Sequence, residues 1–294
     1  RHRWAVAAAF VALAALLGAG LFAFQQQQLR DQEADRARNI ARFLNSLIQR
    51  SSINVGSRRE LTVTEMVERG YEQIRSGTFL PDDAAAGVEA TFANFLMEQG
   101  REDRAEAIAR DALQRAERSA ATEPRIQARG ALAALLVRRG RCPEAKSLYQ
   151  EGEKIIAESR EPLPPGRFLD FRFRRADSWE RCEANPAKAI AEYQRLLPEA
   201  DALPAQAYNV PPAAYRAGLR ITLTLLLAQA GRHAEALGAA EQGLQLAAQH
   251  PDGLYSRIAL HRIRSNVHST VGNPAAGLDD IREAIRLAPG VVNA

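Results

Sequence analysis

One spacing recurs along most of this 294-residue chain and restricts what it can fold into. A glycine or alanine is followed five residues later by another small residue, and each such pair lies between two segments with apolar residues at helical spacing. A glycine can end a helix in the left-handed conformation, and a small residue lets the returning helix approach the first one closely. We therefore predict helical hairpins at these points. The pairs recur every 40 to 47 residues and are Gly100/Ala105, Gly140/Ala145, Ala184/Ala189, Gly231/Ala236 and Gly272/Gly277.

A hairpin of this kind cannot bury its own apolar face, so neighbouring hairpins must stack. Aromatic residues make up only 6% of the chain and alanine is abundant, which suits closely packed helices better than a sheet. We predict an all-α fold with an α-solenoid of about five hairpins at residues 83–290. An N-terminal transmembrane helix at residues 4–24 and a juxtamembrane helical linker at residues 25–82 are expected to precede it.

The repeat pattern resembles the tetratricopeptide repeat (TPR). That family also places small residues seven positions before the turn glycine and seven positions after the small residue that follows the turn. The third unit departs from this pattern, because Asp177 and Leu196 occupy the two positions and proline-rich connectors flank the unit, so we expect irregular packing there. The positions that match are Ala93, Ala133, Thr224 and Ser265 before the turns, and Ala112, Gly152, Gly243 and Ala284 after them.

The stretch from Trp4 to Phe24 carries no charged residue and, at about 1.5 Å per residue in a helix, is roughly as long as a bilayer core is thick. We interpret it as a retained membrane anchor. A cleaved signal peptide is the main alternative, but its apolar core is normally about 7–15 residues long and ends in small residues. A buried helix is a third alternative. Because the sequence begins at Arg1 and not at a methionine, we expect a fragment or a processed chain.

A second resemblance covers residues 1–120. An apolar span, a charged helix, a threonine-valine element that leads into a helix ending in Arg-Gly, and then a repeat array are similar to bacterial serine/threonine protein kinases with a C-terminal extracytoplasmic TPR region. That family's kinase domain would precede Arg1, and this chain contains no Gly-rich phosphate loop, His-Arg-Asp or Asp-Phe-Gly motif. The resemblance implies a single-pass inner-membrane protein with extracytoplasmic repeats, and a need for ATP and Mg only in the upstream domain. The positions that carry it are Phe43, Leu44, Thr62, Val63, Glu65, Arg69 and Gly70.

We expect no catalytic, cofactor or metal site in these residues, although an upstream domain leaves open whether the whole protein is an enzyme. His261 and His268 could share one helix face, but no Cys, Asp or Glu stands near them at ligand spacing, so we interpret them as ordinary repeat residues. The net charge of +4 is spread among mixed charges. The one run that combines basic and aromatic residues, at 168–175, has helical spacing inside a repeat, so no nucleic-acid partner is expected.

The inner, concave face of a TPR array usually binds an extended peptide or a partner helix, and the resemblance implies the same here. The spacing from the turn residues places arginine and amide side chains on that face, which would suit acidic or C-terminal carboxylate groups of a protein or peptide ligand. The alternative is that these are solvated surface residues. The candidate positions are Asn94, Arg174, Arg181, Arg262 and Asn266.

The two cysteines lie at comparable places in neighbouring repeats. Cys142 is in the second inter-helix turn, and Cys182 is at the matching edge of the third. Stacked hairpins place successive turns on one edge, about one helix diameter apart, so a disulfide between them is one interpretation and two unpaired cysteines are the other. A bond would require Cα atoms within about 7 Å of each other.

These observations favour an extracytoplasmic peptide- or protein-binding sensor and scaffold that forms the regulatory part of a serine/threonine protein kinase in signal transduction. A membrane-anchored assembly scaffold without a kinase is one alternative, and the sensor part of a transmembrane transcriptional regulator is another. A homodimer is a further expectation, because small residues in the span and an apolar stripe beyond it could pair with a second copy. The stripe consists of Ile40, Phe43, Leu44, Leu47 and Ile48. Packing of that stripe onto the first hairpins is the alternative.

Overall fold

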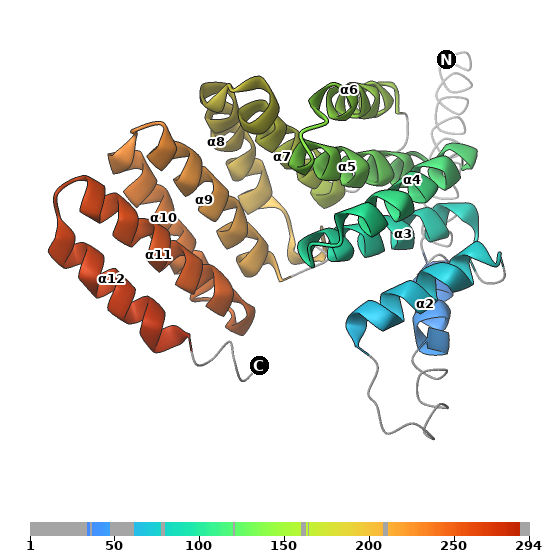
Figure 1. Cartoon of the computed structure of the whole chain (residues 1–294), viewed down its shortest axis with the longest axis horizontal. Helices are drawn as coiled ribbons and strands as arrows, with labels where there is room; N and C mark the ends of the chain where they lie inside the picture. Colours follow the sequence, from blue (N-terminus) through green and yellow to red (C-terminus); the bar gives the residue numbers. More distant parts are fainter. Residues whose placement is uncertain are drawn as a thin grey trace, which may run out of the picture.

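The structure is a computed structural model that describes residues 34–35, 37–47, 62–77, 80–119, 121–159, 163, 165–207 and 211–288. Every regular element within these ranges is a helix, so the all-α prediction is confirmed for them (Figure 1). Residues 37–47 are helical. The helices that follow are α2 (Val63–Arg75), α3 (Asp82–Glu98), α4 (Glu102–Arg118), α5 (Thr122–Arg138), α6 (Cys142–Glu158), α7 (Pro165–Glu183), α8 (Pro186–Ala202), η1 (Ala205–Ala207), α9 (Pro212–Gln229), α10 (His233–Ala247), η2 (Pro251–Gly253), α11 (Leu254–Thr270) and α12 (Pro274–Leu287).

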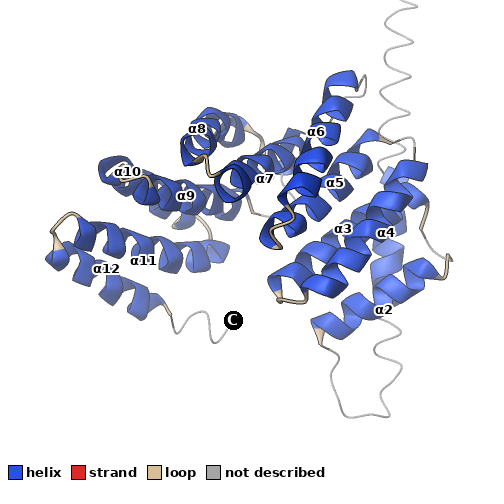
Figure 2. Ribbon diagram, turned by 45° about the horizontal axis from the view of Figure 1, so that its top comes forward, coloured by secondary structure: helices blue, strands red, loops and turns tan. Residues whose placement is uncertain are grey.

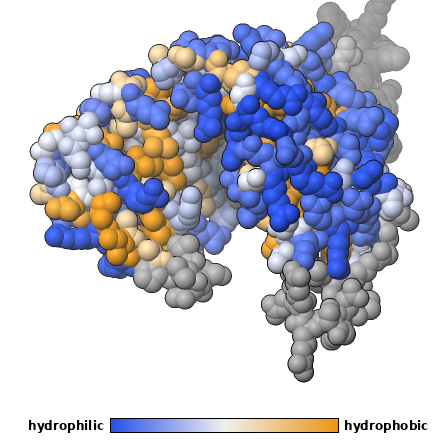
Figure 3. All heavy atoms as spheres, in the orientation of Figure 1, coloured by the Kyte–Doolittle hydropathy of each residue, from blue (hydrophilic) through white to orange (hydrophobic). Residues whose placement is uncertain are grey.

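Five antiparallel hairpins, α3/α4, α5/α6, α7/α8, α9/α10 and α11/α12, lie within the described residues. They follow one another along an arc from α2 to α12, and the two views agree on this order (Figures 1 and 2). The first helices of the first three hairpins pack against one another (α3 on α5, α5 on α7), as do those of the last two (α9 on α11), whereas the third and fourth hairpins meet through α8 and α9. On the face in Figure 3, apolar residues gather over the end that holds α9 to α12, and the end with α2 to α5 is mainly hydrophilic. The predicted solenoid of about five hairpins is therefore present.

Four of the five hairpins turn through a glycine in the left-handed conformation. In the first of them, Gly100 donates its N–H to Met97 O at 3.1 Å, and Arg101 donates its N–H to Leu96 O at 2.9 Å. This is the Schellman arrangement, in which the backbone groups after the helix satisfy carbonyls of its last turn. The same two bonds recur at the second, fourth and fifth turns. The glycines are Gly100, Gly140, Gly231 and Gly272, with φ between 71° and 81°.

The third turn also contains a residue with positive φ, but that residue is not a glycine. Ala184 has φ 48°, and it is the one residue other than glycine with positive φ in the ranges given above. Asn185 there donates its N–H to Trp179 O, one residue further back than in the Schellman turns, and its side chain caps α8 through the N–H of Lys188. The irregularity that the sequence predicted for the third unit therefore begins at its turn.

The small residues that follow the turns are all buried where two helices approach closely. In the last hairpin a Cβ on Gly277 would lie 3.0 Å from the carbonyl oxygen of Ser265 on α11, which leaves almost no room for a side chain. The other members of this set are Ala105, Ala145, Ala189 and Ala236, each at most 1% exposed.

Helix α7 joins two hydrophobic cores. Its Phe171 belongs to the core of the first hairpins, whereas Leu169 and Phe173 belong to that of the later ones. The Phe171 ring fills the space left by Gly152 on α6, since a Cβ there would lie 2.3 Å from Phe171 Cζ, and it meets the Tyr149 ring edge-on at 5.5 Å between centroids. A residue with a side chain at 152 would thus displace α7 from α6.

A disulfide ties the same two helices together. Cys142, the first residue of α6, and Cys182, near the end of α7, are bonded with their Cα atoms 5.4 Å apart. Of the two interpretations that the sequence left open, the structure contains the paired one, on the edge where the second and third turns meet.

The segment before the first hairpin carries the capping box expected at α2. Thr62 donates its backbone N–H to Glu65 Oε2 at 2.9 Å, and the Glu65 N–H donates to Thr62 Oγ1 at 3.2 Å. Phe43 and Leu47 are buried in the first core, and a Cβ on Gly70 would meet the side chains of Leu47 and Phe92 at about 3 Å. Part of the apolar stripe therefore packs onto the first hairpin.

The membrane-spanning helix in the predicted fold class requires correction. No helix in the part of the chain that the structure describes is long and apolar enough to cross a bilayer. The longest, α7, has 19 residues but carries an acidic or basic side chain in every turn. Residues 4–24, on which the prediction rested, lie outside the described residues. We therefore correct the fold class to an all-α solenoid of helical hairpins, and a single-pass location in the inner membrane is not supported.

Replacing Ala184 with glycine should stabilise the protein. The left-handed conformation costs a residue with a Cβ roughly 1–2 kcal/mol, and the greater freedom of glycine in the unfolded chain offsets part of that, so we expect a gain of about 0.5–1 kcal/mol in the free energy of unfolding. Urea titration followed by circular dichroism would measure it. The reverse change, Gly231→Ala, should cost a similar amount, because nothing lies within 4 Å of a Cβ there. Equal midpoints for Ala184→Gly and the parent chain would contradict this account.

The disulfide should stabilise the junction of the second and third hairpins. Cross-linking residues 40 apart restricts the unfolded chain, and we expect Cys142→Ser with Cys182→Ser to lower the free energy of unfolding by about 2–4 kcal/mol. The control is the parent chain with and without a reductant, which should reproduce the loss. Mass mapping under non-reducing conditions that found both thiols free would refute the pairing.

Candidate functional site

A stripe of alternating charge runs along α7 on the inner face of the solenoid. Asp170, Arg174, Asp177 and Arg181 are spaced four, three and four residues apart, which places them on one face of a helix. All four line cavities between α7 and its neighbours α3, α5 and α9. The third hairpin, the least regular one, thus supplies the charged centre of the inner face.

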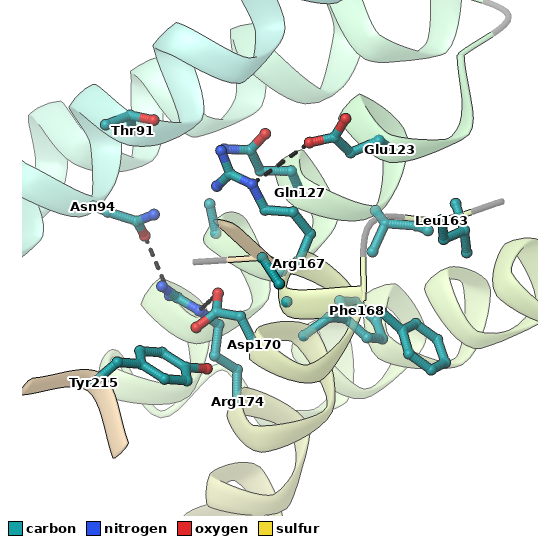
Figure 4. Close-up of a pocket in the computed structure, with 16 residues that line it drawn as sticks. Thr91, Asn94, Glu123, Gln127, Leu163, Arg167, Phe168, Asp170, Arg174 and Tyr215 are labelled. Carbon is teal, nitrogen blue, oxygen red and sulfur yellow. Dashed lines mark hydrogen bonds and ion pairs between the residues drawn. The ribbon is translucent and has the colours of Figure 1, made fainter. Parts of the chain in front are cut away.

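The first cavity, which we call the apolar pocket, lies between α3, α5, the start of α7 and η1 and has a volume of about 510 Å³ (Figure 4). Its wall is largely apolar, and amide and hydroxyl side chains stand at its α3 and α5 side. Arg167 at the rim pairs with Glu123 at 3.5 Å. The lining side chains include Ile126, Leu163, Phe168 and Phe171, with Thr91, Asn94 and Gln127 on the polar side.

The second cavity, which we call the inner groove, is larger and more open, with a volume of about 1080 Å³. Helices α3, α5, α7 and α9 contribute most of its lining, and Tyr149 of α6 and Tyr193 of α8 reach it from behind. Asp170, Arg174 and Tyr215 line both cavities, so the apolar pocket and the inner groove are adjacent compartments of one site.

The Arg174 side chain is already paired. Its Nε donates to Asp170 Oδ2 at 2.8 Å and its Nη1 to Asn94 Oδ1 at 3.3 Å, across 80 residues of sequence, and Figure 4 shows it between the two. The negative charge of Asp170 raises the pKa of Arg174. The positive charge of Arg174 is therefore compensated within the chain.

Asp177 is held differently. Its Oδ1 accepts a hydrogen bond from the Tyr193 hydroxyl at 2.6 Å, and burial raises the pKa of Asp177 from 3.8 to about 6 against the opposing effects of Tyr193, Arg181 and Arg174. Arg181, one turn further along α7, is exposed and has no ion-pair partner among the described residues. Asp177 as an acceptor and Arg181 as a donor therefore have hydrogen-bonding capacity that the described residues use only in part.

The Tyr149 hydroxyl of the site is buried and has no hydrogen-bond partner among the described residues. The residue is 2% exposed. Burial raises the pKa of Tyr149, with Arg174 and Asp177 close enough to influence it. A buried hydroxyl without a partner costs about 1–3 kcal/mol, which a ligand group could recover.

The structure brings together three of the five residues that the sequence placed on the inner face. Asn94 and Arg174 form a hydrogen bond at the apolar pocket, and Arg181 lines the inner groove. Arg262 and Asn266 are exposed on α11 and line neither cavity. Their role in partner binding stays a prediction.

Sequence reasoning missed the groups that complete the site: Asp170, Asp177, Tyr149, Tyr193 and Tyr215. The signal for the two acids was present, because the α7 stripe repeats at helical spacing, and Asp177 occupies a position where the repeat family places a small residue. The tyrosines gave no such signal, since they come from three other helices that meet only in the folded chain.

The two histidines at helical spacing serve a different contact. His261 Nδ1 lies 2.7 Å from Asp280 Oδ1, and Arg264 binds the same carboxylate with three contacts of 2.6 to 3.0 Å. His268 Nε2 is 3.9 Å from Asp280 Oδ2. In the residues that the structure describes, no group of three or more His, Cys, Asp or Glu side chains could hold a metal ion.

Comparison with solved structures identifies the architecture. The crystal structure of BtubC (BKLC) from P. vanneervenii matches with a TM-score of 0.53 and 20% sequence identity, over 80% of this chain and 94% of that one. A putative kinesin light chain from Podosopora anserina with nearly identical TPR-like repeats matches with a TM-score of 0.51 and 16% identity, over 76% and 98% of the two chains. The fold is TPR-like. No protein-family model and no curated protein matches the sequence.

The pKa of Asp177 predicts a pH dependence of stability. Because folding raises this pKa, the folded chain holds the proton more tightly, so the contribution of Asp177 to stability is greatest below pH 3.8 and falls as the pH rises to about 6. Asp177→Asn does not titrate and can still accept the Tyr193 bond. The free energy of unfolding of this variant, relative to the parent, should therefore rise between pH 4 and pH 6, by up to about 1.4 kcal/mol per unit of pKa shift.

Urea titrations at several pH values would measure this difference. Tyr193→Phe should make the pH dependence steeper, because the hydroxyl that it removes lowers the pKa of Asp177. Parallel pH profiles for the Asp177→Asn variant and the parent chain would rule out the assignment.

Proposed function

We propose that this chain is a scaffold that binds an extended segment of a partner protein along its inner face. The observation that carries the proposal is that the apolar pocket adjoins the inner groove, since Asp170, Arg174 and Tyr215 line both. An apolar cavity next to a few convergent polar groups is the usual composition of a ligand site, and an extended peptide can fill both at once.

The charges of the groove support a protein partner over a nucleic acid. Its lining holds four acidic side chains and three arginines, and Arg138 lies 3.6 Å from both Glu98 and Glu102 while Arg174 pairs with Asp170. A surface that binds a phosphate backbone needs an excess of unpaired positive charge. The groove has no such excess.

A more specific function, as the regulatory part of a serine/threonine protein kinase, is a second candidate. It is supported by the resemblance of the segment before the repeats, in which Thr62 and Glu65 form the expected capping box and Phe43 packs beside α2 and α3. The residues encoded before Arg1 test it. A Gly-rich loop followed by His-Arg-Asp and Asp-Phe-Gly motifs would support the kinase, and an upstream segment too short for a kinase domain would exclude it.

Filling the inner groove should abolish binding. Gly218 lines the groove from α9, and nothing lies within 4 Å of a Cβ at this position, so Gly218→Trp adds a large side chain to the groove without disturbing the packing. We expect it to weaken the binding of peptides selected by the full chain from a random dodecapeptide display library by at least about tenfold, measured by fluorescence polarisation.

Gly238→Trp is the matched control. Gly238 is also a helical glycine with nothing within 4 Å of a Cβ, but it lies on α10 and lines neither cavity. The affinity of the Gly238→Trp variant for the selected peptides should equal that of the parent chain. Loss of binding in both variants, or in neither, would argue against the inner groove as the binding site.

A further inference from the structure

We propose that the inner groove recognises a neutral amide side chain of its partner, Asn or Gln, and that the apolar pocket holds a bulky apolar side chain from the same segment. This inference rests on the proposed function and specifies the chemistry of the bound segment. It differs from the acidic or carboxylate ligand that the arginines alone suggested in the sequence.

The alternating charges of α7 disfavour a charged ligand of either sign. An anion that approached Arg181 would lie about one helical turn, roughly 5.4 Å along the axis, from Asp177. A cation that approached Asp177 would lie between Arg174 and Arg181. In a partly buried groove these like-charge interactions are weakly screened, so each charged ligand loses on one side what it gains on the other. A neutral group avoids both costs.

The unused hydrogen-bonding groups match an amide. Arg181 and the unpaired Tyr149 hydroxyl can donate to a carbonyl oxygen, and Asp177 retains an oxygen that can accept from an N–H. An amide supplies one acceptor and one or two donors in a single plane, whereas a carboxylate supplies acceptors only. Asp177, Arg181 and Tyr149 line the same groove, so a ligand group that both accepts and donates can use all three.

The apolar pocket supplies the second part of the recognition. It adjoins the groove, because the paired residues Asp170 and Arg174, and Tyr215, line both cavities. Its volume of about 510 Å³ exceeds what one side chain fills, so a Leu, Phe or Trp can enter together with the adjoining backbone. Burial of such a side chain contributes about 1.5–3 kcal/mol, enough to anchor a short segment.

The test begins with peptides selected by the full chain from a random dodecapeptide display library. We expect the selected sequences to be enriched in Asn or Gln close to a bulky apolar residue and depleted in charged residues. For a synthetic parent peptide, replacing its Asn or Gln by Asp or Glu, or its apolar residue by Ala, should each weaken binding at least about tenfold, measured by fluorescence polarisation. Equal or tighter binding of the acidic peptide would overturn the inference.

The chain itself offers a variant that separates binding from folding. Tyr149→Phe removes a hydroxyl that has no hydrogen-bond partner in the described part of the free chain, so it should weaken binding of the parent peptide about fivefold without lowering the urea midpoint. Tyr255→Phe, at an exposed position on α11, should change neither quantity. Unchanged affinity in Tyr149→Phe would contradict the role of the hydroxyl in the amide site.

The two proposals fail differently. If the library yields no peptide whose binding is weakened by Gly218→Trp, the inner groove does not bind peptides and both proposals fall. If peptides bind in the groove but carry charged residues there, the proposed function stands and the amide specificity is refuted.

Discussion

The close approach of two helices after each turn is the contact on which the rest of this structure depends. It requires a residue that reverses the chain in the left-handed conformation, and a small residue five positions later whose Cβ, or lack of one, lets the backbones meet. Gly277, with the Ser265 carbonyl 3.0 Å from where a Cβ would be, shows how little space remains. Each hairpin formed in this way has an apolar face that only the next hairpin can bury, and the solenoid follows.

The site arises where this repeat is least regular. In the third hairpin an alanine replaces the turn glycine and Asp177 replaces a small residue, and proline-rich connectors flank both ends of the unit. Helix α7 is the longest of the described helices and belongs to two cores, through Phe171 on one side and Phe173 on the other. The disulfide at Cys182 fixes its end against α6. The departure from ideal packing leaves the apolar pocket, and the stripe on α7 gives the adjoining groove its alternating charge.

Much of the fold could be predicted from the sequence, but only part of the site. The turn positions follow from local chemistry, because a positive φ at Gly140 or Gly231 depends on that residue and its immediate neighbours. The arginines were assigned to the inner face from their spacing alone, yet the charge of Arg174 is compensated by Asp170 on its own helix, and its side chain also donates a hydrogen bond to Asn94, 80 residues away. Whether a charge is free depends on what lies opposite, and spacing along one helix does not contain that information.

The sequence by itself determined the helices, the turns and the hairpin repeat, because each depends on residues within a few positions of one another. The tertiary structure decided which side chains share a cavity. Tyr149 comes from α6 and Asp177 from α7, and both line the inner groove, in a packing in which the Phe171 ring occupies the space above Gly152. It also decided that the Tyr149 hydroxyl is buried without a hydrogen-bond partner among the described residues, since the partners of a buried polar group come from all the helices around it.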